Sequence, residues 1–204
     1  MTLITNRARN LRNIRRFNKD FMLHPETVAE HSFYTAYYAY IIALDMRQRG
    51  ISINPELTMR YGLLHDIEEA TTGDVSRDYK HATPEIRKTM EALGGTLFAR
   101  MIDTYLPTTK SKIRTALYSG WADAKSDSEE GRLVEFADAL DALVNMIEER
   151  TMGNTTMIGK IKLQTDHLLQ HYSHDPAYGS YLREIKQYGS KKTKRRKNDK
   201  TNGI

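Results

Sequence analysis

The 204-residue chain contains 39% hydrophobic and 28% charged residues, five prolines and twelve glycines, which is the composition of one globular domain and excludes a fibrous or wholly disordered protein. Cysteine is absent, which excludes disulfides and thiolate metal sites, so any metal must be held by His, Asp and Glu side chains. The net charge of +5 comes from the segment 191–200, which holds seven basic residues and one acid, and the rest of the chain is slightly acidic.

Apolar residues recur at helical spacing from end to end, and no stretch sustains the alternation of a β-strand, which predicts an all-α fold. The first helix is expected over about 4–17. The second begins near Pro25 and runs to about Arg47, and the third begins at Pro55 and reaches the His-Asp pair at 65–66. The polar segment 71–85 is expected to be a structured loop. Further helices are expected at about 84–105, 111–124, 128–150, 156–172 and 176–188.

The chain is expected to form one domain over residues 1–188, followed by a basic, disordered tail over residues 189–204. This tail is either a solubilising terminus or a segment that makes weak, nonspecific contacts with nucleic-acid backbones. No stretch approaches the length of a membrane span, and the first residues lack the apolar core of a secretory signal. We therefore expect a cytoplasmic protein without membrane contacts.

The stretch LLHDIEEATTGD, residues 63–74, gathers a histidine and several acids in a helix-forming sequence. If the stretch is helical, His65, Asp66 and Glu69 share one face, and Glu68 is expected to face the solvent. Imidazole and carboxylate ligands together suit Mn, Fe, Co, Ni or Zn. Taken alone, the cluster is better explained as the solvated face of an amphipathic helix.

Other polar side chains interrupt apolar helices. His31 lies in PETVAEHSFYTAYYAYIIAL, where a core histidine bonded to a carbonyl or a tyrosine hydroxyl is the ordinary explanation. In GRLVEFADALDALVNMIEE, Asp138 and Asp141 form a strip with Asn145, which is either a solvated face or a costly burial that requires a partner or a cation. A metal site accounts for His31, the His-Asp pair and Asp138 together.

The order His31, then His65-Asp66, then Asp138 resembles the H…HD…D signature of the HD-domain phosphohydrolases. Within them the chain resembles the YfbR-like 5'-deoxynucleotidases and the related phage deoxynucleoside triphosphate triphosphohydrolases. The resemblance rests on IRRF before PETVAEHS, on HDIEEATTGD, on YKHATPEI and on FADALDALVNMIEE, and it covers about Ile14 to Asn154. It implies an all-α HD-domain helical bundle, from a bacterium or a phage, that associates as a dimer or a larger homo-oligomer.

The resemblance also implies a metal centre. One divalent transition metal, Mn, Co, Zn or Fe, would be bound by four residues, and a triphosphate substrate would also admit Mg. These metal ligands are His31, His65, Asp66 and Asp138. Glu69 would orient or deprotonate the attacking water, or protonate the leaving oxygen, and Asp74 would help to position the substrate and the water.

Substrate-binding residues follow from the same resemblance. Arg16 and Lys80 would neutralise phosphate oxygens, although Arg16 could equally belong to the basic end of a first helix. Phe17 stands where the family usually has tryptophan, and its ring could stack on the sugar or the base. Trp121 and Asp123 match no motif of the family and are expected to be structural.

Four functions remain open at this point. The leading one is a metal-dependent 5'-deoxynucleotidase that releases phosphate from a deoxynucleotide. The second is a deoxynucleoside triphosphate triphosphohydrolase, of the dATP type, which would need extra cations such as Arg77, Lys80 and Arg87. The third is a nucleic-acid-binding protein that works through its tail, and the fourth is a cyclic-nucleotide phosphodiesterase.

Overall fold

The computed structural model describes residues 7–80 and 82–189, and the secondary structure of this part is entirely helical apart from one isolated β-bridge. The first six residues, His81 and the basic segment 190–204, on which most of the expected disordered tail falls, lie outside the described residues. None of the described helices is long and apolar enough to cross a membrane. The elements are η2 (Arg7–Asn13), α1 (Val28–Gln48), α2 (Pro55–Leu64), α3 (Glu69–Thr72), α4 (Arg77–Lys80), α5 (Pro84–Asp103), η3 (Thr108–Lys110), α6 (Ser111–Asp123), α7 (Glu129–Thr151), α8 (Met157–Tyr172), η4 (Pro176–Tyr178) and α9 (Gly179–Gly189).

The long helices begin where side chains can satisfy the first free backbone N–H groups. Thr27 and Glu30 form a reciprocal capping box at the start of α1. Asn54 accepts from the N–H of Leu57 in front of α2, and Ser128 accepts from the N–H of Gly131 in front of α7. The all-α prediction and most of the predicted helix starts are therefore confirmed.

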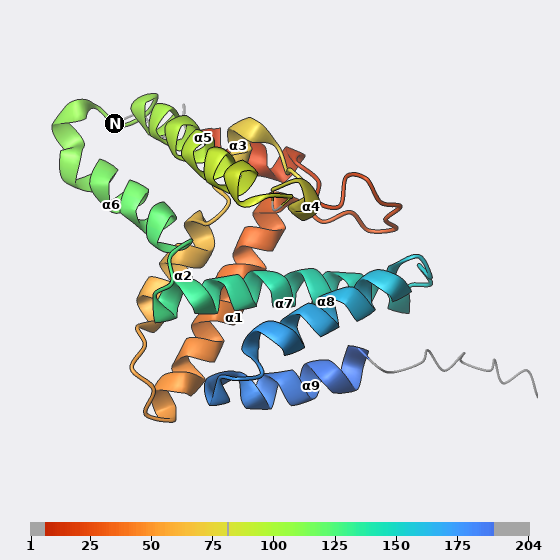
Figure 1. The fold of residues 1–204 in the computed structure, drawn as a ribbon. Helices are drawn as coiled ribbons and strands as arrows, with labels where there is room; N and C mark the ends of the chain where they lie inside the picture. The colour runs from red at the N-terminus through yellow and green to blue at the C-terminus, as the bar shows by residue number, and fades with distance from the viewer. Residues whose placement is uncertain (1–6, 81, 190–204) are drawn as a thin grey trace, which may run out of the picture.

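Helix α1 is the central element, and α2 and α7 both pack against it. The contact with α2 is close because Gly62 lies against Ala36: a Cβ atom at position 62 would be 2.6 Å from the Cα atom of Ala36. Helices α7, α8 and α9 form successive layers on one side, while α5 and α6 lie near the other end of the molecule (Figure 1). His31 on α1 thus lies between helices that come from both halves of the sequence.

Apolar burial is divided between these two sides. Around α7 and α8, the rings of Phe136, Tyr172 and Tyr178 pack with centroid separations between 4.7 and 5.0 Å. Around α5 and α6, Phe98 packs on Trp121, with ring centroids 6.0 Å apart. A third cluster, which includes Ala39, Tyr61 and Val134, joins α1, α2 and α7.

The chain departs from the expected elements before α1. The helix predicted over 4–17 is wrong for the described residues, because η2 is a 3-10 helix that ends at Asn13. The following segment is extended, since the N–H of Arg16 bonds to the carbonyl of Glu26 and Arg15 pairs with Thr27. Phe17 then adopts a φ of 54°, in the left-handed region that is uncommon for a non-glycine residue.

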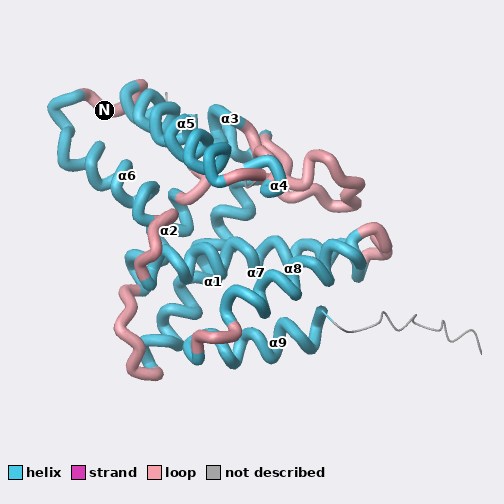
Figure 2. The backbone as a smooth tube through the Cα atoms, viewed as in Figure 1, coloured by secondary structure: helices cyan, strands magenta, loops and turns pink. Residues whose placement is uncertain are grey.

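Two further boundaries differ from the prediction. Helix α2 ends at Leu64, and the backbone bonds from Ile67 to Leu64 and from Glu69 to Asp66 form a tight turn before α3. The loop predicted over 71–85 contains the short helix α4. The loop before α1 and the short segment 73–76 after α3 lie side by side (Figure 2), and Asn18 Nδ2 donates to the Asp74 carbonyl at 3.0 Å.

Candidate metal centre

Three elements bring two imidazoles and a carboxylate together. The Nε2 atoms of His31, from α1, and His65, at the end of α2, are 3.2 Å apart. The Nε2 atom of His31 is also 3.1 Å from Oδ1 of Asp138, from α7. Ligand atoms of these three residues all lie within 4.8 Å of one another, which is the spacing of a metal-binding group.

Asp66 completes the convergence from the turn after α2. Its Oδ2 atom is 3.2 Å from Nε2 of His65 and 3.7 Å from Nε2 of His31. Burial raises the pKa of the Asp66 carboxyl, but the charge and the hydrogen bond of His65 lower this pKa by more than burial raises it. The net pKa of Asp66 is therefore well below its usual range. All four residues predicted to bind metal are thus brought together.

The outward ring nitrogens explain why this arrangement suits a cation. Nδ1 of His31 is 2.6 Å from Oδ2 of Asp141, and Nδ1 of His65 is 2.7 Å from the Gly62 carbonyl. Each Nδ1 therefore carries a proton, so Nε2 is the nitrogen of each ring that is left to bind a cation, and the two Nε2 atoms lie 3.2 Å apart. Two lone pairs at this distance repel unless a cation or a proton lies between them, so the donor set fits a divalent transition metal.

Beside the ligands, Glu69 and Lys80 form a buried ion pair. Nζ of Lys80 is 2.5 Å from Oε1 of Glu69, whose side chain is 2% exposed. Burial and then the charge of Asp66 raise the pKa of Glu69 to about 9. Burial lowers the pKa of Lys80, but Asp66 and Glu69 outweigh it and raise the pKa overall, so the ammonium persists. Asp74 lines the same cavity, and burial raises the pKa of its carboxyl.

Arg16 enters the site from the extended segment before α1. Its Nη2 is 3.7 Å from Oδ1 of Asp138, and its Nη1 is 3.7 Å from Oδ2 of Asp141 and 3.9 Å from Oε2 of Glu26. Nη1 of Arg16 and Oε2 of Glu26 are both buried without a hydrogen-bond partner. The guanidinium of Arg16 packs against the Phe17 ring, 5.7 Å from its centroid, and both side chains line the cavity.

The expectation that Glu68 faces solvent is wrong. Its residue surface is 9% exposed, and Oε2 accepts a hydrogen bond of 2.7 Å from Nε1 of Trp121. The tight turn after α2 rotates Glu68 toward α6, where a regular helix would have directed it to the surface. Trp121 is 4% exposed and packs in the apolar cluster.

Sequence reasoning missed Asp141 and Lys125 as parts of the site. Asp141 had a signal, since it follows Asp138 by three residues in an apolar helix. Lys125 had none: it follows α6 in a polar segment without a motif, yet its Nζ donates to the His65 carbonyl and lies 3.3 Å from Oε1 of Glu68.

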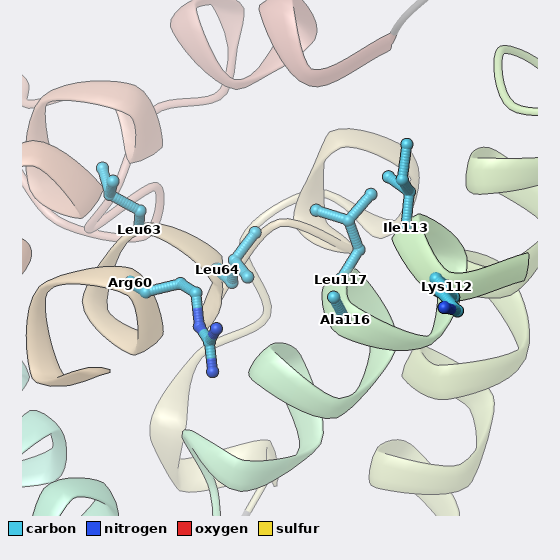
Figure 3. A pocket seen from close by; sticks show the side chains of 7 residues that line it. All are labelled: Arg60, Leu63, Leu64, Lys112, Ile113, Ala116 and Leu117. Carbon is cyan, nitrogen blue, oxygen red and sulfur yellow. The ribbon is translucent and has the colours of Figure 1, made fainter. Parts of the chain in front are cut away.

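A cavity of about 600 Å³ contains this chemistry. Its lining includes the predicted residues Arg16, Phe17, His65, Asp66, Glu69, Asp74, Lys80 and Asp138. A second cavity, of about 410 Å³, lies between α2 and α6 and is lined mainly by Leu63, Leu64, Ile113 and Leu117 (Figure 3). It offers no carboxylate or imidazole, so the larger cavity is the candidate active site.

The cations expected to serve a triphosphate are less well placed. Arg87 lines the cavity, but its Nε is 2.9 Å from Oε1 of Glu91. The side chain of Arg77 lies outside the described residues. Lys80 is engaged by Glu69.

Residues 5–188 match the family model of the YfbR-like 5'-deoxynucleotidases. A 5'-deoxynucleotidase of Vibrio cholerae is 29% identical over 154 residues, which cover 75% of this chain and 77% of that protein. The 5'-deoxynucleotidase YfbR of Escherichia coli O127:H6 is 31% identical over 141 residues, which cover 68% of this chain and 69% of that protein.

Solved structures share the fold. An HD-domain phosphohydrolase from Listeria innocua superposes with a TM-score of 0.77 at 22% identity, over 93% of this chain and 90% of that one. The cyanophage S-2L HD phosphohydrolase DatZ, bound to dA and one catalytic Zn²⁺ ion, superposes with a TM-score of 0.56 at 16% identity, over 89% and 95%. The prediction of an HD-domain helical bundle is thereby confirmed.

Proposed function

Because this chain belongs to the YfbR-like 5'-deoxynucleotidase family and is a hydrolytic enzyme of the HD-domain phosphohydrolase fold, we propose that it hydrolyses deoxynucleoside 5'-monophosphates to deoxynucleosides and phosphate. The observation that carries this proposal is the convergence of His31, His65, Asp66 and Asp138 on one point, with a buried arginine beside it.

These four residues would hold the metal. When bound, a divalent metal supplies a Lewis acid and lowers the pKa of water enough to give a nucleophile near neutral pH. Mn, Co, Zn and Fe all suit two imidazoles and two carboxylates. The bonds of Nδ1 to Asp141 and to the Gly62 carbonyl aim both Nε2 atoms inward, where each would bind the ion in its unprotonated form.

Glu69 is proposed to carry the proton of the reaction. A carboxylate whose pKa is raised by burial and by the charge of Asp66 can accept a proton from the attacking water and then donate it to the leaving 5'-oxygen. Lys80 holds the Glu69 side chain in place. Asp74, across the cavity, is proposed to position the substrate and the water.

Arg16 is proposed to bind the phosphate. It lines the cavity, and its distances of 3.7–3.9 Å to Asp138, Asp141 and Glu26 are longer than hydrogen bonds, so the guanidinium can still donate to a phosphate oxygen. Phe17, next to it, is proposed to pack against the sugar or the base.

The charges of the cavity favour a monophosphate over a triphosphate. Among the described residues, Lys80, Lys125 and Arg87 each face a carboxylate, and Lys160 pairs with Asp20 at 2.9 Å. Only one of the lining arginines, Arg16, combines burial with an unsatisfied donor. Lys19 also lines the cavity and donates to the Ser76 hydroxyl at 3.1 Å, so it adds a second cation, bonded to a hydroxyl and not to a carboxylate. A triphosphate brings more negative charge than these two groups can neutralise.

We also propose that residues 1–188 act as one domain, in the cytoplasm, as a homo-oligomer of two or more chains. The family match over residues 5–188 supports the single domain. Nonspecific contact of the basic tail with nucleic acid would be an accessory property, because it leaves the clustered His and Asp residues unexplained.

The direct experiment is a substrate panel. The metal-stripped protein is reconstituted with Mn²⁺, Co²⁺, Zn²⁺ or Mg²⁺ and incubated with each deoxynucleoside mono-, di- and triphosphate, and products are separated by chromatography. Nucleoside and inorganic phosphate from the monophosphates support the proposal. Free triphosphate from a deoxynucleoside triphosphate would replace it with the second function.

A further inference from the structure

Lys125 occupies an unusual position beside the metal ligands, in the wall of the same cavity. It follows α6, yet its ammonium reaches the turn that carries His65 and Asp66. There it donates to the His65 carbonyl, lies 3.3 Å from Oε1 of Glu68, and stands 5.1 Å from the centre of the Trp121 ring.

The backbone explains why the turn needs such a support. The N–H of Ile67 donates to the Leu64 carbonyl and the N–H of Glu69 donates to the Asp66 carbonyl, so neither of these bonds reaches the carbonyl of His65. The Lys125 ammonium donates a hydrogen bond to that carbonyl. A buried carbonyl without a partner would cost about 1–3 kcal/mol.

Glu68 extends the same support. Its two oxygens reach Lys125 and Trp121, which lie four residues apart at the end of α6. On the other side, Gly94 lets α5 approach closely, since a Cβ atom there would be 3.3 Å from both Glu68 and Trp121. The turn is therefore fixed to α5 and α6 by groups that do not belong to the predicted site.

We propose that Lys125 is a positioning residue for the metal centre, which holds the turn of His65 and Asp66 in the geometry that binds the ion. This inference rests on the metal site of the proposed function. Lys125 touches the ligand residue through its backbone carbonyl, so its effect falls on metal affinity and not on the bond that is broken. Groups that orient metal ligands typically change metal affinity about 10- to 100-fold when removed.

The test compares Lys125→Met, Lys125→Arg and the control Lys112→Met, which removes another lysine of the α6 region, at the rim of the second cavity. Isothermal titration of the metal-stripped proteins with Mn²⁺ gives the dissociation constant. We expect Lys125→Met to weaken Mn²⁺ binding at least tenfold. Lys125→Arg should recover part of the loss, and Lys112→Met should bind like the wild type. Raising the Mn²⁺ concentration should recover part of any activity that Lys125→Met loses.

Two results would overturn the proposal. One is Mn²⁺ affinity of Lys125→Met within twofold of the wild type. The other is normal Mn²⁺ affinity with a raised KM, which would make Lys125 a substrate-contacting residue.

If Lys125→Met does not fold, Glu68→Gln tests the same proposal, because it keeps an oxygen for Trp121 and removes the charge facing Lys125. Weaker Mn²⁺ binding by Glu68→Gln supports the proposal, and unchanged binding overturns it. Since titration needs no nucleotide, failure of the wild type to cleave any nucleotide would refute the proposed function alone.

Discussion

Asp141 accepts a hydrogen bond from Nδ1 of His31 across 2.6 Å, although 110 residues separate the two in sequence. Both side chains are buried. This bond places a proton on Nδ1 of His31 and directs Nε2, the nitrogen that would bind the metal, toward His65 and Asp138. The ligand geometry therefore depends on a carboxylate outside the ligand set.

Replacing Asp141 by asparagine should weaken Mn²⁺ binding about 10- to 100-fold, because an amide can present a donor to His31 and no longer favours the required tautomer. Isothermal titration of the metal-stripped variant measures this. Asp103→Asn, on the exposed Asp103–Arg114 pair, is the matched control. An affinity equal to that of the control would show that Asp141 does not orient His31.

Glu69→Gln should lower kcat about 10²- to 10⁴-fold while Mn²⁺ binding stays near the wild-type value, because the side chain is proposed to move a proton and not to hold the ion. Phosphate release at saturating substrate and metal gives kcat. The control is Glu56→Gln, exposed in the first turn of α2. Wild-type turnover by the Glu69 variant would remove it from the mechanism.

The sequence anticipated the elements whose signals are local. Thr27 with Glu30, Asn54 with Pro55, and Ser128 each carry the chemistry of a helix start, and the predicted helices begin within a few residues of them. His31 and Asp138 were found because a polar side chain in an apolar helix requires a reason.

The sequence failed where tertiary contacts decide. Residues 14–16 contain nothing against a helix, but their pairing with residues 26–28 holds them extended. Glu68 was assigned to the wrong face because helical spacing was continued through a turn. Lys125 could not be identified because its role depends on a carbonyl 60 residues away in sequence.

Glu149 gives a prediction about pH. Its carboxylate accepts from the N–H groups of Leu23 and His24, at 2.8 and 2.5 Å, and from Nδ2 of Asn154 at 2.7 Å. Burial raises the pKa of Glu149, but these hydrogen bonds outweigh it and lower the pKa overall. The stabilisation is therefore fully present above the usual pKa of about 4.3 and is lost as the pH falls through the lower folded value.

Glu149→Gln should consequently reduce the free energy of unfolding by about 2 kcal/mol at pH 7, because charge-assisted bonds to the segment before α1 are weakened. Urea unfolding at a series of pH values measures the difference from the wild type. The difference should shrink below about pH 4, where the wild-type carboxylate also becomes protonated. A difference that does not change with pH would assign the loss to packing.

Gly62→Ala should destabilise the protein by about 1–3 kcal/mol, because the added methyl group would force α2 away from α1 and with it His65 away from His31. Gly159→Ala in α8 is the matched control, since a Cβ atom there meets nothing within 4 Å. That control should gain about 0.5 kcal/mol from helix propensity. Thermal unfolding compares the two variants, and equal melting temperatures would contradict the close α1–α2 contact.

The most direct test of the account is phosphate release from deoxynucleoside 5'-monophosphates by metal-stripped protein, by the same protein reconstituted with Mn²⁺ or Co²⁺, and by reconstituted Asp66→Ala. The account predicts stoichiometric nucleoside and phosphate from the reconstituted wild type, and none above background from the other two. Full phosphate release by the metal-stripped protein or by Asp66→Ala would contradict it.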